Sequence, residues 1–320
     1  MPTTSASEQF VTLFDAKFLP SGLALHTSLM QHAAPFRLWI LCMDALVEQQ
    51  LARLALPHVA LIPLREIESA ELLAVKPSRS RGEYCWTVTP FTFDAVFARA
   101  PSIERVTYLD ADLFFFRSPA LLLHELSVSG KDVLITEHAY APEYDLSEKT
   151  GRFCVQFLTV KRSPGGRTVT SWWQQRCLEW CFARAEEGKF GDQKYLDCWP
   201  TLFADEVHIV RQVHETLGPW NVRAMLSDVT ARLPVFYHFH GLRITDPRRV
   251  VLYNGYRVGS GGERLYRSYL EALSVELAKL AGHGIATPTL PQRGLREWLK
   301  ACKNIVLRRY ATASLARAGR

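Results

Sequence analysis

The sequence lacks the features that would direct the protein into a membrane or a secretion route. No stretch of its 320 residues holds the roughly eighteen consecutive apolar residues that a membrane-spanning helix needs. The opening residues, MPTTSASEQFVTLFDAKFLP, have neither the basic start nor the apolar run of a signal peptide. We therefore expect a cytoplasmic protein.

Paired cysteines and a strong excess of charge are also missing. The seven cysteines are odd in number, scattered, and include no Cys-X-X-Cys pair, which indicates reduced thiols. Cys177 and Cys181 lie four residues apart on a predicted helix, where they would either share a metal or line a buried face. The net charge of +6 is modest and no nucleic-acid-binding signature accompanies it, so nucleic acid is not an expected partner.

What the chain does have is the composition and patterning of a globular α/β protein. Its apolar content of 48% and charged content of 22% are enough for a full core in one or two domains. Apolar runs alternate with helical patterns, which predicts a parallel α/β sheet. The predicted strands are 9–15, 36–44, 59–64 and 105–109, and the predicted helices are 22–31, 45–56 and 89–100.

Two acids interrupt an apolar run directly after the last of these strands, in VTYLDADLFFFRSP. Open α/β sheets bind ligands beyond the carboxyl ends of their strands, which is where Asp110 and Asp112 stand. In extended backbone, residues two apart point to the same side, so both carboxylates would face one ligand. Paired carboxylates suit a hard divalent cation; the alternative is a solvated strand end or a turn.

A phosphohydrolase of the haloacid dehalogenase type also ends a strand with Asp-X-Asp. That motif continues to Thr or Val two residues after the second acid, whereas position 114 is Phe in this chain. The phosphohydrolase interpretation therefore fits poorly.

The residues around the two acids resemble a known family. The stretch EYCWTVTPFTFDAVFARAPSIERVTYLDADLFFFRSP, residues 83–119, resembles the Asp-X-Asp region of GT-A fold glycosyltransferases, specifically bacterial nucleotide-diphospho-sugar transferases related to glycosyltransferase family 8. The resemblance covers residues 9 to about 245, with less force outside the Asp-X-Asp region. It continues through GRFCVQFLTVKR (151–162), GDQKYLDCWP (191–200), LGPWNV (217–222) and VFYHFHGLR (235–243).

The resemblance implies a GT-A type α/β fold, a mixed and mostly parallel sheet flanked by helices, with a metal centre. Asp110 and Asp112 would hold Mn²⁺ or Mg²⁺ against the two phosphates of a sugar nucleotide. A late His-X-X-Gly stretch commonly adds a ligand, which the spacing assigns to His238, although His240 would share its face in an extended strand. Paired histidines with only local hydrogen bonds are the alternative.

Further site residues follow from the same resemblance. Asp192 would hold hydroxyls of the transferred sugar and Gln193 would stabilise its oxocarbenium-like state, or Gly191 and Asp192 would simply form a turn and an N-cap. Cys154 stands where the family commonly has Asn, which leaves Gln156 as the expected polar contact to the donor.

The remaining expected contacts lie at both ends of the matched region. Trp220 and Asn221 would be an apolar platform and hydrogen-bonding group near the sugar, or a tight turn packed by the aromatic residue. The family has a Lys at the position of Ile244, so Arg243 is the nearest cation for the diphosphate. Contacts to the nucleotide are expected from Phe14, Asp15, Glu83 and Tyr84.

The family match fades after residue 245, and we divide the chain into a catalytic domain, 1–250, and a helical extension, 251–320. Residues 263–282 have helical spacing, and RGLREWLKACKNIVLRRYATASLARAGR, from Arg293, predicts a basic amphipathic helix. Such a helix would lie on an anionic membrane surface, at the inner face of the cytoplasmic membrane, or pack on the catalytic domain.

The sequence thus predicts a metal-dependent glycosyltransferase that uses a nucleotide-sugar donor, expected to be a UDP-sugar. Retention of anomeric configuration is implied by the resemblance. A surface glycan or lipid-linked, lipopolysaccharide-type acceptor would account for the basic tail. Two alternatives stay open. A sugar-nucleotide-forming nucleotidyltransferase would need a Gly-rich phosphate loop after FVTLFD, which is absent; a non-catalytic sugar-nucleotide- or glycan-binding module would bind donor without turnover.

Overall fold

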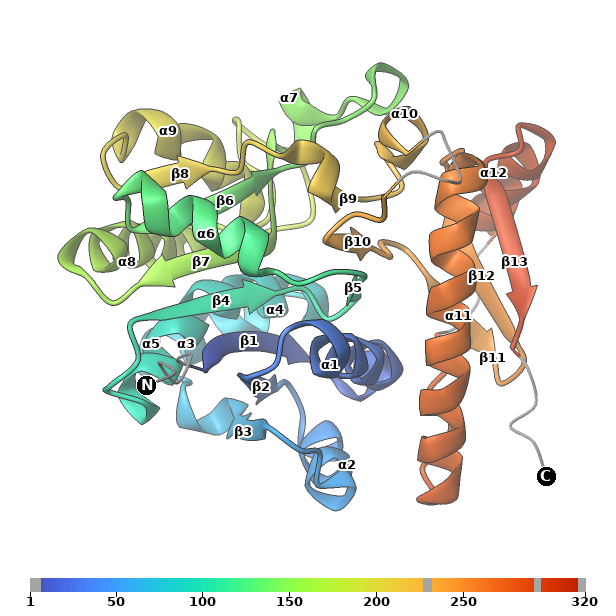
Figure 1. Ribbon diagram of the computed structural model, residues 1–320, viewed down its shortest axis with the longest axis horizontal. Coiled ribbons are helices and arrows are strands. Elements are labelled where there is room, and N and C mark those ends of the chain that lie inside the picture. Colours follow the sequence, from blue (N-terminus) through green and yellow to red (C-terminus); the bar gives the residue numbers. More distant parts are fainter. Residues whose placement is uncertain (1–6, 227–231, 291–294, 316–320) are drawn as a thin grey trace.

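The computed structural model describes residues 7–226, 232–290 and 295–315, with the side chains of residues 295–300 left out. A seven-stranded sheet in the order β3-β2-β1-β4-β7-β6-β8 forms its centre (Figure 1). The strands are β1 (Glu8–Phe14), β2 (Phe36–Cys42), β3 (Val59–Pro63), β4 (Arg105–Leu109), β6 (Val133–Glu137), β7 (Phe153–Lys161) and β8 (Val207–Ile209). Strand β7 runs antiparallel to β4 and β6, and the other neighbours are parallel. The mixed, mostly parallel sheet that we expected is confirmed.

Helices cover both faces of this sheet. Alternate residues of β1 enter different cores, Phe10 on one face and Val11 on the other. The Phe10 face packs on α1 (Leu19–His32), α2 (Ala45–Leu54), α6 (Ala120–Ser129) and α11 (Gly259–Gly282), and the Val11 face on α4 (Arg81–Val88), α5 (Thr92–Arg99) and α8 (Pro164–Glu179). Each fully buried Leu or Phe stabilises the fold by about 1.5–3 kcal/mol relative to exposure. The predicted early helices are confirmed as α1, α2 and α5.

A small sheet, β5-β10-β9, lies beyond the carboxyl end of β4. Its strands are β5 (Leu113–Phe115), β9 (Thr216–Leu217) and β10 (Phe236–His238). Strand β10 pairs antiparallel with β5, so His238 stands opposite Leu113. This pairing brings a segment from late in the chain beside Asp110 and Asp112.

The C-terminal part contains strands as well as helices. A third sheet, β11-β12-β13, joins β11 (Arg243–Asp246), β12 (Arg249–Asn254) and β13 (Tyr310–Ser314) beside the long helix α11 (Figure 1). The ladder between β11 and β12 crosses residue 250, where we placed the end of the catalytic domain. That division stays a prediction. Strand β13 follows α12 (Leu295–Val306), so the basic helix ends earlier than its sequence pattern indicated.

Within the described residues, no helix is both long and apolar enough to cross a membrane. The predicted apolar face of α12 includes Leu295, Trp298 and Leu299, whose side chains lie outside the described residues. Its last turn exposes Ile305 (55%) and Val306 (83%). Attachment of this helix to a membrane surface stays a prediction.

Helix α10 (Val222–Met225) packs on the first turn of α11 through glycines. A methyl group at Gly261 would overlap the carbonyl oxygen of Leu226, and one at Gly262 would come within 3.2 Å of Val222 Cγ1. A methyl group at Gly282, the last residue of the same helix, would meet nothing within 4 Å. The close contact at one end of α11 therefore requires glycine.

We expect Gly261→Ala to lower the free energy of unfolding by about 1–3 kcal/mol, because the added methyl group forces α10 and α11 apart. Urea unfolding monitored by circular dichroism measures this change. Gly282→Ala is the matched control and should be neutral or slightly stabilising, since alanine favours a helix over glycine. Equal stabilities of the two variants would contradict the close packing.

Candidate active site

Asp110 and Asp112 lie in a turn between β4 and β5. The amide of Asp110 donates to Gln156 O (3.0 Å), and the amide of Leu113 donates back to Asp110 O (3.1 Å). The backbone is therefore not extended through both acids, and the alternation argument from the sequence was wrong in its geometry. The turn nevertheless directs both carboxylates toward the same residue, His238.

His238 is the group that balances the charge of the two acids. Its Nε2 lies 3.0 Å from Asp112 Oδ1 and 3.8 Å from Asp110 Oδ2. On the other side of the ring, Nδ1 lies 2.8 Å from Gln156 Oε1. Because an amide oxygen only accepts, Nδ1 carries a proton and donates it, and Nε2 is turned to the carboxylates. Gln156 is fully buried, so this orientation is fixed.

The electrostatics of the three groups are strongly coupled. Burial alone would lower the pKa of His238, but the charge and hydrogen bond of Asp112 outweigh it and hold that pKa well above its ordinary value. Burial opposes ionisation of Asp112 as well, yet His238 keeps the pKa of Asp112 below its usual range. Desolvation raises the pKa of Asp110 to about 6, with Asp112 adding to the effect. A proton on His238 thus occupies the position of a cation.

Both carboxylates stay reachable from solvent, with 28% of the Asp110 side chain and 19% of the Asp112 side chain exposed. The hydroxyl of Tyr108 donates to Asp110 Oδ1 (3.1 Å) and orients this carboxylate. A ligand entering from solvent can therefore reach oxygen atoms that the protein already holds in place.

A thiol that the sequence did not assign completes this cluster. Single ligand atoms of Asp110, Cys154 and His238 all lie within 4.8 Å of one another, close enough for the three residues to hold one metal ion. Cys154 is buried on β7, two residues before Gln156 and on the same side of that strand. Because Cys154 and Gln156 are two residues apart, extended backbone through them could have placed the thiol beside Gln156 from the sequence alone. From the sequence, Cys154 was noted only as a departure from the family's Asn.

His240 occupies a more open position than His238. Its ring centroid lies 5.5 Å from that of His238, and the residue is exposed. Protein still surrounds the ring, and this desolvation lowers the pKa of His240 to about 4, with the charges of His238 and Arg243 acting in the same direction. Of the two histidines, His238 is the one in contact with the acids. Arg243, on β11, lies close enough for its charge to contribute to the lowered pKa of His240.

Asp192 and Gln193 lie at the start of the 3-10 helix η6 (Gln193–Cys198). Asp192 is buried, and desolvation together with the charge of Asp110 raises its pKa well above the ordinary value, which favours the neutral carboxyl. It makes no side-chain cap, unlike the N-cap alternative. Gly191, with φ of 52°, forms the turn before it. Gln193 Nε2 donates to Thr150 O (2.6 Å), which fixes its amide.

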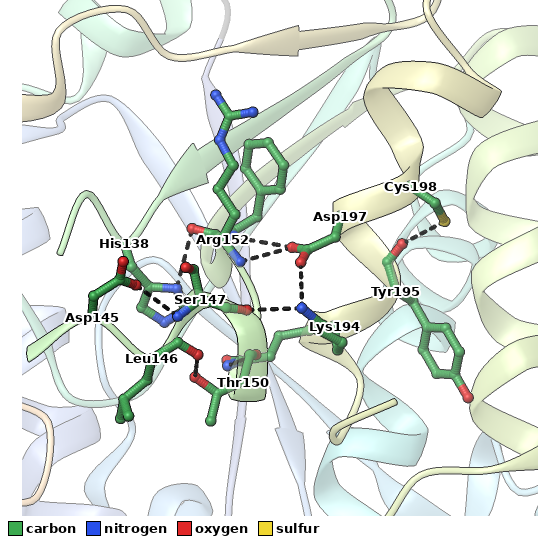
Figure 2. Close-up of polar contacts among 12 residues, drawn as sticks. His138, Asp145, Leu146, Ser147, Thr150, Arg152, Lys194, Tyr195, Asp197 and Cys198 are labelled. Atoms are coloured by element: carbon green, nitrogen blue, oxygen red, sulfur yellow. Dashed lines mark hydrogen bonds and ion pairs between the residues drawn. The ribbon is translucent and has the colours of Figure 1, made fainter. Parts of the chain in front are cut away.

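The segment that receives this bond is itself tied to η6, as Figure 2 shows. Asp197 Oδ1 accepts from the amide of Arg152 (2.8 Å), and Lys194 Nζ donates to Ser147 O (2.8 Å) and to Asp197 Oδ2 (2.9 Å). Side chains of η6 thus hold the backbone of residues 147–152. This connection sets the position of Gln193.

Trp220 and Asn221 form a tight turn rather than an open platform. Trp220 Nε1 and Asn221 Nδ2 both donate to His138 O, at 2.7 and 2.8 Å, and Asn221 Oδ1 accepts from Gly218 N (2.9 Å). Both residues are buried. Trp220 instead packs on a residue of the site: its ring lies edge-on to the ring of His238, with the centroids 5.5 Å apart. A direct contact of either residue with a sugar stays a prediction that this packing does not favour.

The residues after β1 are divided between the core and an ion pair. Phe14 is buried with its ring against Gly22, so packing does not favour the predicted nucleotide contact of this ring. Asp15 caps the helix that follows by accepting from Lys17 N (2.9 Å), and its other oxygen lies 2.7 Å from Arg81 Nε. Arg81 also pairs with Asp44, at the end of β2.

Glu83 and Tyr84 have internal partners too. Glu83 forms a capping box with Ser80 and accepts from the amide of Ala183 (2.7 Å). Burial opposes its ionisation, but these hydrogen bonds keep the pKa of Glu83 below its usual range. The Tyr84 hydroxyl donates to Glu68 Oε1 (2.9 Å). The donor contacts predicted for both residues stay predictions.

We expect Asp112→Asn to lower the pKa of His238 in metal-free protein, because the charge that holds its proton is removed while burial remains. Titration of the histidine ring resonances by NMR measures the change. His26 is the internal control: it is buried elsewhere, where desolvation lowers its pKa, and its titration should not move. An unchanged His238 titration would show that Asp112 does not hold the proton.

Comparison with solved structures shows the fold. GlyE of Streptococcus pneumoniae TIGR4, a glycosyltransferase, is 16% identical with a TM-score of 0.52 over 90% of this chain and 66% of its own. The galactosyltransferase LgtC, solved with donor and acceptor sugar analogs, is 12% identical with a TM-score of 0.50 over 91% of this chain and 99% of its own. The chain therefore has the fold of GT-A glycosyltransferases.

Sequence comparison gives closer relatives, while no protein-family model matches the chain. The Bacillus subtilis (strain 168) protein YfnF, described as uncharacterized, is 33% identical over 252 residues, which are 74% of this chain and 82% of YfnF. YfnD of the same strain, also described as uncharacterized, is 29% identical over 76% of this chain and 79% of its own length. The chain belongs to the family of YfnF.

Proposed function

We propose that this protein is a metal-dependent glycosyltransferase related to glycosyltransferase family 8. It transfers a sugar from a nucleotide-diphosphate donor, expected to be a UDP-sugar, to a cell-surface glycan or lipopolysaccharide-type acceptor. The observation that carries the proposal is the contact of Asp110, Asp112 and His238 at the carboxyl end of β4, within a GT-A fold. Open α/β sheets bind their ligands at this end of the strands.

The residues present fit the divalent cation that the fold family implies. Asp110, Asp112 and His238 Nε2 would hold Mn²⁺ or Mg²⁺, and Gln156 already turns Nε2 toward that position. When bound, the cation would offset the negative charge that develops on the departing nucleoside diphosphate. The raised pKa of His238 supports this fit, because it shows that the site already favours a positive charge.

Residues beyond the carboxylate cluster would position the sugar. The raised pKa of Asp192 favours its neutral carboxyl, and a neutral carboxyl donates a hydrogen bond as well as accepting one, which would suit a sugar hydroxyl. Gln193, fixed by its bond to Thr150, would place its amide oxygen next to the positive charge that develops on the sugar ring. Both roles depend on geometry that the protein holds before substrate arrives, so little reorganisation accompanies the reaction.

The finer assignments follow the resemblance to family 8. Retention of anomeric configuration is one of them, and NMR of the first-formed product would overturn it by showing the opposite anomer. The acceptor is inferred by analogy, since LgtC was solved with donor and acceptor sugar analogs. A place at the inner face of the cytoplasmic membrane would follow from α12 if this helix binds anionic lipid.

We expect wild-type protein with Mn²⁺ to release nucleoside diphosphate from one member of a panel of sugar nucleotides, and Asp112→Asn to reduce that rate by at least about 100-fold. Loss of a charged ligand weakens both metal binding and charge stabilisation at the leaving group. Coupled assays of diphosphate release, run after chelation and again after return of Mn²⁺, measure the rate.

Asp205→Asn is the matched control, because Asp205 is exposed and away from the described contacts of the site. It should retain the wild-type rate. Tight donor binding without any turnover, even by hydrolysis, would favour a non-catalytic binding module. Formation of a sugar nucleotide from a sugar phosphate and a nucleoside triphosphate would favour the nucleotidyltransferase alternative.

Cys154 makes the metal preference of this protein testable. A thiolate favours softer ions such as Co²⁺ and Zn²⁺ over Mg²⁺, and Cys154 lies within 4.8 Å of ligand atoms of Asp110 and His238. We expect Co²⁺ added to metal-free protein to give the near-ultraviolet charge-transfer absorption of a thiolate ligand. Cys154→Asn should abolish this band and weaken Co²⁺ binding by about tenfold.

Cys302→Ser is the control for the cobalt experiment, since Cys302 lies on α12, outside the site. It should leave the band intact. If wild-type protein binds Co²⁺ without this absorption band, and Cys154→Asn binds Co²⁺ with the same affinity as wild type, then Cys154 lies next to the metal and does not bind it.

A further inference from the structure

A cavity whose lining includes three arginines lies outside the carboxylate cluster. It has a volume of about 510 Å³ and opens between α10, the start of α11 and the end of α12. We call it the arginine pocket, defined by Arg223, Arg257, Gly259, Glu263, Val306 and Arg308. In Figure 1 these three helices gather at one end of α11, beside β12 and β13.

The arginine pocket carries an excess of positive charge. Three guanidinium groups line it, against the single carboxylate of Glu263. Across the described part of the chain, the guanidinium groups of Arg223 and Arg308 have no hydrogen-bond or ion-pair partner. Arg257 uses only Nε, which donates to Leu307 O (3.0 Å), so its two terminal nitrogens are left for a ligand. Guanidinium groups with free donors match the oxygen geometry of phosphate.

The start of α11 adds to this preference for an anion. The 24-residue helix begins at Gly259 in the pocket, and no side chain caps its first amides. The aligned peptide dipoles of a helix favour negative charge at such an end. Gly259, the first residue of the helix, lines the pocket, whereas Gly261 and Gly262 are buried against Leu226 and Val222.

Backbone contacts from distant parts of the chain build the walls of the pocket. The amide of Arg257 donates to the hydroxyl of Tyr144 (2.8 Å). The amide of Gly255 donates to Arg309 O (2.7 Å), and the amide of Arg309 donates to Asn304 O (2.7 Å). These bonds hold the turn at Arg308, whose φ of 53° is unusual for a residue with a side chain. The three arginines thus come together through the tertiary fold.

The rim of the pocket is apolar on one side. Val306 lines the pocket and is 83% exposed, and its neighbour Ile305 is 55% exposed. Exposed β-branched residues beside a cluster of free cations suit a ligand that has an anionic group and an apolar chain. A free phosphate ion would use only the first of these features.

The pocket is connected to the candidate active site along the chain. Arg223 lies on α10, three residues after Trp220, whose ring packs against His238 at 5.5 Å. Tyr144, which receives the amide of Arg257, follows Ala141, whose amide donates to Trp220 O (3.0 Å). Segments that line the pocket therefore lead directly into residues that support the carboxylate cluster.

We propose that the arginine pocket binds the phosphate or diphosphate group of an amphiphilic acceptor, with the apolar part of that acceptor along Ile305 and Val306. The three arginines and the start of α11 hold the anionic group, and the sugar-accepting end extends toward the carboxylate cluster. The role of this ligand as an acceptor rests on the proposed transfer reaction. Binding of an amphiphilic phosphate in the arginine pocket does not depend on that reaction.

The test uses geranyl diphosphate as the amphiphilic probe, with geraniol and inorganic pyrophosphate for comparison. Titration calorimetry is run on the full chain in EDTA, so that no cation bridges a diphosphate to Asp110 and Asp112. We expect geranyl diphosphate to bind more tightly than pyrophosphate and geraniol not to bind. Arg223→Gln and Arg308→Gln should each weaken binding of geranyl diphosphate by about tenfold or more, because each loses a charge-assisted hydrogen bond.

Arg267→Gln is the matched control, an exposed arginine on the same helix but outside the pocket, and it should bind as wild type does. Asp112→Asn should also bind the probe in EDTA, which separates a failure of this inference from a failure of the transferase proposal. A rise in salt should weaken binding to wild type, a readout that needs no variant to fold.

Two results would overturn the inference. Absence of binding in EDTA, or binding that both pocket variants leave unchanged, would show that the arginines do not form an anion site. Pyrophosphate binding as tightly as geranyl diphosphate would show a free phosphate site, without a role for the apolar rim.

Discussion

The requirement for a positive charge at the end of β4 governs the candidate active site. Two carboxylates with restricted access to water repel each other, and neither is stable as an anion unless a cation or proton offsets it. His238 meets this need, with Nε2 3.0 Å from Asp112. Its position depends in turn on the pairing of β10 with β5, and its ring orientation on Gln156. The pairing within the small second sheet thus places the histidine that balances the charge of the two acids.

The sequence predicted the elements whose signals are local. Alternating strands and helices predicted the sheet, and a strand followed by two acids predicted the end of the sheet at which the candidate site lies. His238 was assigned by its spacing to a glycine, but nothing local separated it from His240; the difference arises because β10 ends at His238, against β5. Cys154 was missed as a candidate ligand because its proximity to Asp110 and His238 arises only where three segments meet: β7, β10 and the turn after β4.

Other departures have the same origin in long-range contacts. Trp220 and Asn221 had the chemistry of a sugar platform, yet both donate to a carbonyl 82 and 83 residues away. Buried amide and indole groups need partners, and the nearest free carbonyl was not visible in the sequence. Strand β13 was expected as helix because the basic amphipathic pattern continues toward it; pairing with β12 overrides that weak local preference.

The polar side chains of η6 have a comparable structural role. Asp197 and Lys194 are bound to the backbone of residues 147–152, and this connects the fixed amide of Gln193 to a segment on the other side of the site. The position of Gln193 therefore depends on how these two segments are held together.

The late position of β13 has a consequence for biosynthesis. Residues 310–314 complete the third sheet by pairing with β12, and their ladder starts directly after the turn that contains Arg308. On the ribosome, the central sheet can assemble while this strand is still inside the exit tunnel. The carboxylate cluster, which needs residues up to 238, can then form before the arginine pocket, which also needs residues 306 and 308.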